Sequence, residues 1–151
     1  TWSLWDLALT DHTGPHTFYD TPRVMVRGFA CLEGTFDPKD KIPYPVLVTT
    51  VDAFCAERGI DRVDFLKLDI EGSELPALRG CQRMLAEGRI VRIMVETTLL
   101  DRSRAEVQAM DDLLRGAGFR SFRARTDGRT VPVDVMAHRD LREDILWLRE
   151  G

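Results

Sequence analysis

The sequence predicts an α/β fold built from parallel strand–helix–strand units, and two observations support this. From Val46 onward, apolar strand-like runs alternate with segments whose apolar residues recur at helical spacing. Each helical segment also begins at a Ser or Thr that can cap it and ends near a glycine. Such alternation is typical of right-handed crossovers between parallel strands.

The length and composition fit one globular domain. The chain has 151 residues, of which 44% are hydrophobic and 30% charged, and a chain of this size buries a core without disulfide or metal support. We expect one domain over residues 1–151. It comprises a hairpin over 1–19, a loop-rich segment over 20–45 and strand–helix units over 46–151.

The N-terminal third has the weaker pattern. Extended runs at Leu7–Thr10 and His16–Tyr19 flank a turn containing Asp11 and Gly14, which predicts a β-hairpin. Residues 20–45 hold four prolines and two glycines, and this composition predicts mostly loop. A short strand at Arg23–Arg27 is the exception.

The first predicted strand–helix units follow in order. Val46–Val48 reads as a strand, and Thr50 can cap a helix that stops at Gly59. The run Val63–Ile70 predicts the next strand. Ser73 then caps a second helix ending at Gly88, and its apolar face is formed by Leu75, Leu78, Gln82 and Leu85.

The remaining elements continue the alternation. Ile90–Glu96 predicts a strand, and Ser103 with Glu106 forms a capping box for a third helix. That helix carries an apolar stripe formed by Val107, Met110, Leu114 and Ala117. Phe119–Arg125 and Asp144–Leu148 predict the last two strands.

The net charge, the lack of long apolar runs and the cysteine pattern restrict the partners and the cellular location that we expect for this protein. Lys and Arg total 21 against 25 Asp and Glu, a net charge of −4, so we expect no nucleic-acid partner. No apolar run approaches the ~18–20 residues of a membrane span, and the first residues lack the features of a signal peptide. Three cysteines without CxxC spacing suggest reduced core thiols and a cytoplasmic location. Three tryptophans are expected to anchor the packing: Trp2, Trp5 and Trp147.

The candidate site lies where strands end, because ligands of parallel sheets bind beyond the carboxyl ends of the strands. Lys67 and Asp69 share one face of their strand if Leu66 and Leu68 are buried. A ligand-facing Asp69 is the favoured interpretation, and a plain surface ion pair is the alternative. Glu71 follows at the same end.

Two further acids stand near that end. Glu74 falls in the first turn of the next helix, where the helix dipole alone would favour an acid. Glu96 ends the following strand, and with Asp69 it could bind one substrate group or a divalent cation such as Mg²⁺ or Ca²⁺. Two carboxylates by themselves do not define a metal site. The histidines His12, His16 and His138 show no ligand spacing.

Four segments in order resemble the FkbM family of S-adenosylmethionine-dependent methyltransferases. They correspond to that family's "TLD" helix start, "KxDxEGxE" strand and turn, "LxG" helix and strand closing in Glu. Here these are Val48–Phe54, Asp64–Glu74, Leu78–Gly80 and Ile93–Glu96. The segment Leu7–Asp11 is similar to the upstream "ALSD" segment of the family.

The resemblance implies a Rossmann-like methyltransferase sheet, S-adenosylmethionine as cofactor, and methylation of a hydroxyl on a sugar or another small secondary metabolite. It places Asp69 near the sulfonium and the acceptor, with Glu71 and Lys67 orienting the acceptor or its proton. Asp6 and Ala8 would border the adenine pocket.

The chain departs from the family pattern at its start. The glycine-rich first strand that approaches the cofactor does not occur before Leu7, so we expect the N-terminal strands of the family fold to be missing from this sequence. We therefore expect weak cofactor binding. A non-catalytic interaction module with the same fold is the alternative, and an uncovered strand at Val63–Ile70 would favour a homodimer. The pair Asp69 and Glu71 also mimics a two-metal nuclease, but the late Tyr-x-x-x-Asp of those enzymes is absent.

Overall fold

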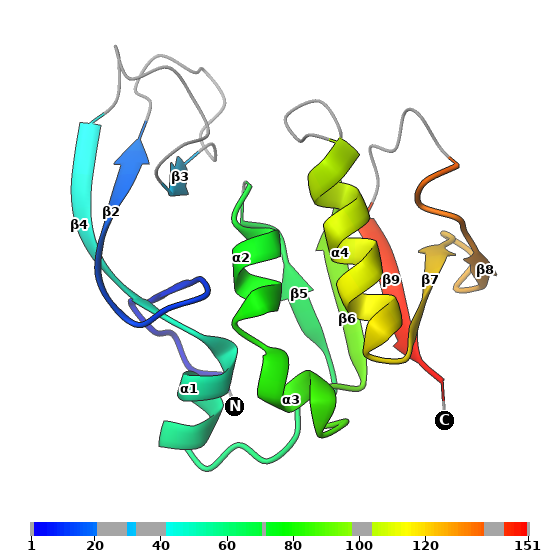
Figure 1. Cartoon of the computed structure of the whole chain (residues 1–151), viewed down its shortest axis with the longest axis horizontal. Helices are drawn as coiled ribbons and strands as arrows, with labels where there is room; N and C mark the ends of the chain where they lie inside the picture. Colours follow the sequence, from blue (N-terminus) through cyan, green and yellow to red (C-terminus); the bar gives the residue numbers. More distant parts are fainter. Residues whose placement is uncertain are drawn as a thin grey trace.

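The computed structural model describes residues 2–20, 30–32, 42–70, 72–97, 104–137 and 144–150, which form two β-sheets and a layer of helices (Figure 1). In chain order the elements are β1 (Ala8–Leu9), β2 (Gly14–Asp20), β3 (Ala30–Leu32), β4 (Ile42–Thr49), α1 (Val51–Glu57), β5 (Leu66–Leu68), α2 (Glu74–Arg79), α3 (Gln82–Ala86), β6 (Arg92–Glu96), α4 (Arg104–Gly116), β7 (Phe119–Ala124), β8 (Thr130–Pro132) and β9 (Asp144–Arg149).

The N-terminal sheet has the order β1-β4-β2-β3, which corrects the hairpin predicted for residues 1–19. β1 and β2 are not neighbours, because β4 lies between them, parallel to β1 and antiparallel to β2. The turn at Asp11–Gly14 is therefore a crossing from one side of β4 to the other. The loop-rich interpretation of 20–45 is also corrected in part, since β3 and the start of β4 fall within it. The strand expected at Arg23–Arg27 lies outside the described residues.

Two prolines inside β4 are the reason why the sequence predicts a loop where β4 begins. In the register of β2 with β4, Pro43 faces Tyr19 and Pro45 faces Thr17, while Pro15 of β2 faces Leu47. The three pairs that contain a proline are thus every second pair along the two strands. Thr49 of β4 continues this alternation, and its carbonyl points away from β2 and accepts a hydrogen bond from Thr10 N. The missing proline N–H groups therefore face away from the β2–β4 ladder, where a strand tolerates them.

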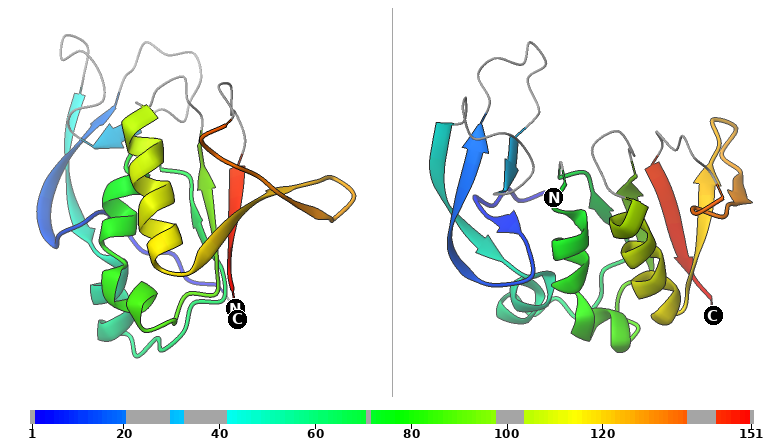
Figure 2. Two further views of the ribbon diagram at one scale, coloured as in Figure 1. Left: turned by 45° about the vertical axis from the view of Figure 1, so that its right-hand side comes forward. Right: turned by 45° about the horizontal axis from the view of Figure 1, so that its top comes forward.

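The second sheet has the order β5-β6-β9-β7-β8. β5 and β6 are parallel and connected through α2 and α3, as the sequence predicts. β9 is antiparallel to both β6 and β7 and separates them, so the strand that follows α4 is not a direct neighbour of β6. The predicted strand Val63–Ile70 is shorter than expected, with an isolated bridge from Val63 to Ile90 before β5 begins. β7 and β8 project from the body as a twisted ribbon (Figure 2).

The helix predicted from Ser73 to Gly88 is two helices, α2 and α3, which meet at Gly80 and Cys81. A side chain at Gly80 would collide with the carbonyl oxygen of Thr10. Gly80 also accepts a hydrogen bond from Asp52 N through its own carbonyl at 3.0 Å. The break changes the helical phase, which leaves the expected core residue Gln82 exposed.

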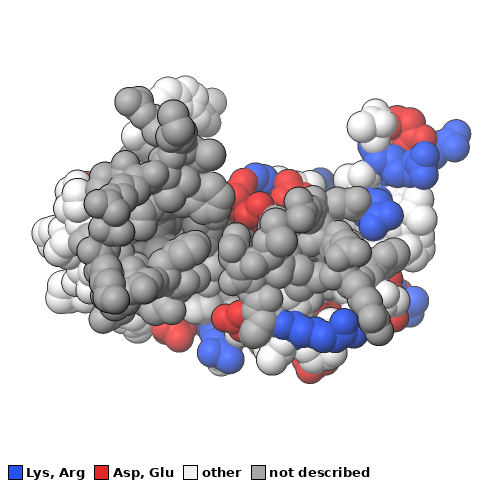
Figure 3. All heavy atoms as spheres, turned by 90° about the horizontal axis from the view of Figure 1, so that it is seen from above, with Lys and Arg blue, Asp and Glu red and all other residues white. Residues whose placement is uncertain are grey.

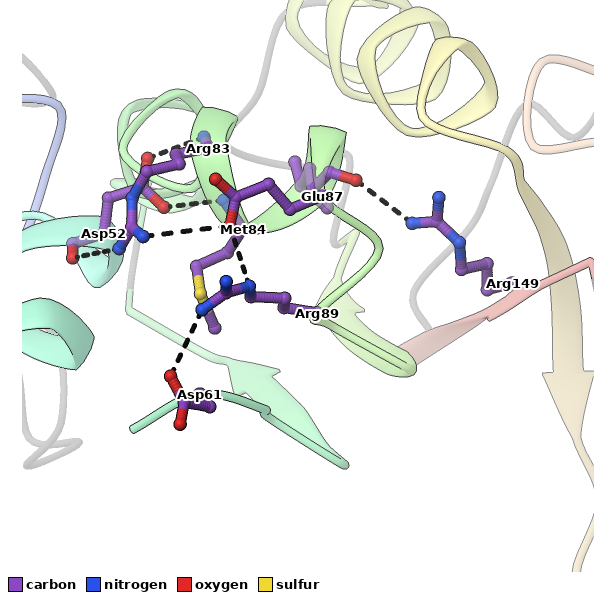
Figure 4. Close-up of polar contacts among 8 residues, drawn as sticks. Asp52, Asp61, Arg83, Met84, Glu87, Arg89 and Arg149 are labelled. Atoms are coloured by element: carbon purple, nitrogen blue, oxygen red, sulfur yellow. Dashed lines mark hydrogen bonds and ion pairs between the residues drawn. The ribbon is translucent and has the colours of Figure 1, made fainter. Parts of the chain in front are cut away.

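Two side chains cap the N-termini of α1 and α3. The Oγ1 atom of Thr50 accepts a hydrogen bond from Ala53 N at 2.9 Å, which confirms its predicted role at the start of α1. Asp52, in the first turn of α1, also caps α3. Its carboxylate accepts hydrogen bonds from Arg83 N at 2.7 Å and Met84 N at 3.0 Å (Figure 4).

The core lies between the second sheet and the helices, and α2 and α4 cover the same face of that sheet (Figures 1 and 2). Trp147 is 1% exposed and anchors the core as expected, whereas Trp2 is 85% exposed and Trp5 51%, so these two are not core residues. Cys55 and Cys81 are free, buried thiols. Burial raises the pKa of both thiols, and the charge of Asp52 adds to the effect. Within the described ranges, no helix is long and apolar enough to cross a membrane.

The cap that Asp52 forms on α3 predicts a measurable contribution to stability. Removing a side-chain cap costs roughly 0.5–2 kcal/mol, so Asp52→Ala should lower the free energy of unfolding by about 1–2 kcal/mol in urea titrations. The matched control is Asp64→Ala, because Asp64 forms an exposed ion pair with Arg62, and such pairs contribute at most ~1 kcal/mol. Equal effects of the two substitutions would contradict the capping role.

Candidate active site at the carboxyl end of β5

The strand β5 turns charged side chains outward at its end. Leu68 is fully buried and Leu66 half-buried, while Lys67 projects to the opposite face, as the alternation predicts. The Lys67 ammonium donates a hydrogen bond to Oδ2 of Asp69 at 2.5 Å, and both side chains are 44% exposed. The pair therefore lies at a solvent-accessible strand end.

Two more carboxylates approach this pair. Leu68 pairs with Val95 in the parallel ladder, so Asp69 and Glu96 leave the neighbouring strands β5 and β6 at the same edge. Glu96 is in turn paired with Asp144, the first residue of β9. Figure 3 looks onto this end of the molecule and shows acidic side chains grouped beside a basic one.

The neighbouring carboxylates change the pKa of Lys67. The hydrogen bond to Asp69 raises the pKa of the Lys67 ammonium, and the negative charges of Asp69, Asp144 and Glu96 raise it further. Lys67 is therefore protonated at neutral pH. Among the described residues, the Lys67 ammonium thus lies near three carboxylates, which together favour a negative potential around it.

Asp144 is the site residue that the sequence pattern missed. Its strand was predicted, but strands of a parallel unit would bring their ends, not their beginnings, to this edge. Because β9 runs antiparallel to β6, its first residue lies beside the last residue of β6. No local signal in the sequence distinguishes the two directions.

The turn after Asp69 is held by Glu74. This residue has no exposed surface, and its carboxylate accepts hydrogen bonds from Ile70 N at 2.9 Å and Gly72 N at 3.0 Å. Gly72 has a φ of 101°, a conformation that favours glycine. Ser73 occupies the N-cap position of α2 without a capping hydrogen bond from its side chain. Glu74 was expected to interact with the dipole of the helix. In the structure it also holds the preceding turn through two hydrogen bonds to backbone N–H groups.

The other predicted site residues lie elsewhere. Asp6 is exposed and Ala8 lies in β1, at the edge of the N-terminal sheet, whereas Asp69 follows β5 in the other sheet. Their role at adenine stays a prediction. Glu71 lies outside the described residues, as does His138. His12 contacts His16, and its Nδ1 donates a hydrogen bond to Oδ1 of Asp11 at 2.9 Å, near the start of β2.

The structure gives no support to a divalent cation at Asp69 and Glu96. Across the described ranges, no group of three or more His, Cys, Asp or Glu side chains is arranged to hold a metal ion. The Lys67 ammonium already supplies a positive charge to Asp69. Asp69 therefore has a cationic partner within the chain itself.

Comparison with known proteins identifies the family of the chain. The family model of the methyltransferase FkbM domain matches residues 10–121, well over half of the chain, and the match includes Lys67, Asp69, Glu74 and Glu96. The chain belongs to the FkbM methyltransferase domain family, as its motifs indicate. Searches of curated proteins and of solved structures gave no significant match.

Glu74 should be required for the geometry of the turn. Glu74→Gln keeps the size of the side chain but replaces one acceptor oxygen by an amide donor, so one partly buried N–H loses its partner. Such a loss costs about 1–3 kcal/mol. We expect a lower free energy of unfolding by that amount and faster amide exchange at Ile70 or Gly72. Glu57→Gln, at a side chain 66% exposed, is the control, and normal exchange in Glu74→Gln would show that the turn does not depend on Glu74.

Proposed function

We propose that this domain is an S-adenosylmethionine-dependent methyltransferase that methylates a hydroxyl group of a sugar or a similar small metabolite. The observation that carries the proposal is the outward-facing pair of Lys67 and Asp69 at the end of β5. This pair stands in the chain's match to the FkbM methyltransferase domain. It is also at the strand end where open α/β sheets bind ligands.

The sheet topology supports a Rossmann-like arrangement. β6 and β7 are both antiparallel to β9 and so run in one direction, which is also that of β5. Helices connect β5 to β6 and β6 to β7. Three strands of one direction with helical connections are what such a fold requires.

The residues present fit one part of the cofactor. S-adenosylmethionine carries its methyl group on a positively charged sulfur, and the carboxylates of Asp69, Glu96 and Asp144 create a negative potential that favours such a cation. When bound, the cofactor supplies the methyl group. A glycine-rich turn for its amino acid end is not found in the described part of the chain, so the fit extends to the sulfonium end alone.

The pair of Lys67 and Asp69 would act on the acceptor. The free oxygen of Asp69 can accept a hydrogen bond from the acceptor hydroxyl and take its proton. Lys67 holds Asp69 in position through their hydrogen bond. Because its pKa is raised above 10.5, Lys67 loses its charge only in strongly alkaline solution, so the pair is intact at neutral pH.

The role of Asp69 is tested by Asp69→Asn, which preserves shape and removes the charge. Methyl transfer from radiolabelled S-adenosylmethionine should fall at least ~10²-fold, the usual scale for a positioned acid–base or electrostatic group. Asp64→Asn is the matched control, since Asp64 is an exposed acid just before the same strand. Near-normal turnover of Asp69→Asn with unchanged folding would remove Asp69 from the site.

The cofactor is tested by titration of the 151-residue chain with S-adenosylmethionine. Each missing hydrogen bond to a charged group is worth about 1.5–3 kcal/mol, and each 1.4 kcal/mol is about tenfold in affinity. We therefore expect calorimetry to show weak binding and amide NMR shifts to centre on Asp69, Glu96 and Asp144. Tight binding would mean that another segment replaces the glycine-rich turn. A complete absence of binding would favour the alternative of a non-catalytic interaction module.

A further inference from the structure

The strands β7 and β8 form a hairpin whose charged side chains take no part in the candidate active site. We call residues 122–132 the arm, which projects from the body as a twisted ribbon (Figure 2). Its residue pairs run from Phe122 with Pro132 to Ala124 with Thr130. Every residue from 124 to 132 is exposed, so the outer part of the arm is open to a partner.

The tip of the arm is held in one conformation by its own hydrogen bonds. Arg125 N donates to Arg129 O at 2.8 Å, and Gly128 N donates to Arg125 O at 3.0 Å. Gly128 has a φ of 81°, which glycine adopts without strain. The carboxylate of Asp127 accepts a third hydrogen bond, from Arg129 N at 3.0 Å. A partner that binds the tip therefore loses little free energy in ordering it.

The register of the hairpin gathers the arginines of the arm on one face. Residues that lie opposite each other in an antiparallel pair share a face, and so do alternate residues of one strand. Arg123 pairs with Val131, and the backbone hydrogen bond between Arg125 and Arg129 continues the same register toward the tip. We call the face formed by these four side chains the basic face. The side chains of the opposite face are all uncharged: Phe122, Ala124, Thr130 and Pro132.

The two arginines nearest the tip keep donors for a partner. Arg125 forms one long ion pair, with Asp127 at 3.7 Å, and its side chain is 60% exposed. Arg129 is exposed, and among the described residues its guanidinium has no hydrogen-bond or ion-pair partner. Val131, on the same face, is 44% exposed. Because each guanidinium carries five N–H donors, both arginines can bind an acidic group at the same time.

The arm is basic, whereas the rest of the chain is acidic. Residues 122–132 hold three arginines and one aspartate, a net charge of +2, and since the whole chain carries −4, the remainder carries −6. Basic side chains surround a small acidic patch at the arm, at the upper right of Figure 3. The tip lies about 10 Å beyond Phe122, at ~3.3 Å for each residue. At physiological ionic strength, charges more than about 8 Å apart are largely screened, so the acidic body scarcely weakens the attraction of the tip for anions.

The charge distribution narrows the class of partner. Guanidinium groups bind carboxylates and phosphates through paired hydrogen bonds, so an acidic protein, a nucleic acid or an anionic membrane would each offer suitable groups. A nucleic acid or a membrane extends well beyond the arm and would face the net charge of −6 on the rest of the chain. A compact protein can bind the arm alone. Arginine beside an exposed apolar side chain is also typical of protein–protein interfaces.

We propose that the basic face of the arm binds an acidic surface of a partner protein, with carboxylates on Arg125 and Arg129 and an apolar side chain on Val131. This docking surface goes beyond the proposed function and does not depend on methyl transfer. Exposed charge pairs contribute to the rate of association and to selectivity more than to affinity. We therefore expect a complex that exchanges rapidly and that salt weakens.

The test uses the 151-residue chain and a nine-residue peptide in which glutamates at alternate positions flank a central leucine, with threonine at every other position. The peptide should shift the amide NMR signals of residues 123–131 in a titration that reaches saturation. A control peptide with glutamine in place of each glutamate keeps the shape, and should bind at least ~10-fold more weakly. Raising the NaCl concentration from about 0.05 M to about 0.5 M should weaken binding of the acidic peptide.

Matched charge reversals locate the contact. Arg125→Glu combined with Arg129→Glu should weaken binding of the acidic peptide at least ~10-fold, because attraction becomes repulsion. Arg62→Glu combined with Arg79→Glu changes the net charge equally at two exposed arginines outside the arm, and should weaken binding less than about threefold. Circular dichroism checks the folding of both double variants.

Four outcomes would overturn the proposal. The first two are equal binding of the two peptides and equal weakening by the two charge reversals. The third is tighter binding of an oligothymidine or of phosphatidylserine vesicles than of the acidic peptide, through the same residues of the arm. The fourth is self-association of Arg125→Gln combined with Arg129→Gln, seen by light scattering, while peptide binding is unchanged. That result would assign the arginines to the protection of the exposed edge strand β8.

Discussion

The buried carboxylate of Glu74 ties the candidate site to the core of the domain. It accepts hydrogen bonds from the N–H groups of Ile70 and Gly72, which are partly buried at the point where the chain leaves β5. The next residues of α2, Leu75 and Leu78, pack into the core. The same carboxylate therefore sets the direction in which Asp69 emerges and the position of the helix that covers the sheet.

The sequence could predict what short-range chemistry determines. The Thr50 cap, the outward face of Lys67 and Asp69, and the apolar stripe of α4 all follow from spacing within a few residues. The break at Gly80 could not be foreseen, because it depends on Thr10, seventy residues earlier in the chain. The place of Asp144 in the site depends on the direction of β9, which no local pattern encodes.

The error at the N-terminus has a similar origin. A turn signal between two extended runs usually means that the runs pair with each other. Here a third strand, β4, takes the position between them, and its prolines hid it within a segment that looked like loop. The exposure of Trp2 and Trp5 belongs to the same region, although both were expected to anchor the packing.

The prolines of the N-terminal sheet have a consequence for how its strands find their alignment. Sliding β2 by one residue against β4 would require one of the two strands to turn over, so that the other set of backbone groups faces the ladder. If β4 turned, Pro43 and Pro45 would stand in hydrogen-bonding positions without donors; if β2 turned, Pro15 would. Either misalignment loses bonds that the native one keeps. The three prolines therefore disfavour shifted registers of β2 and β4 while the sheet assembles.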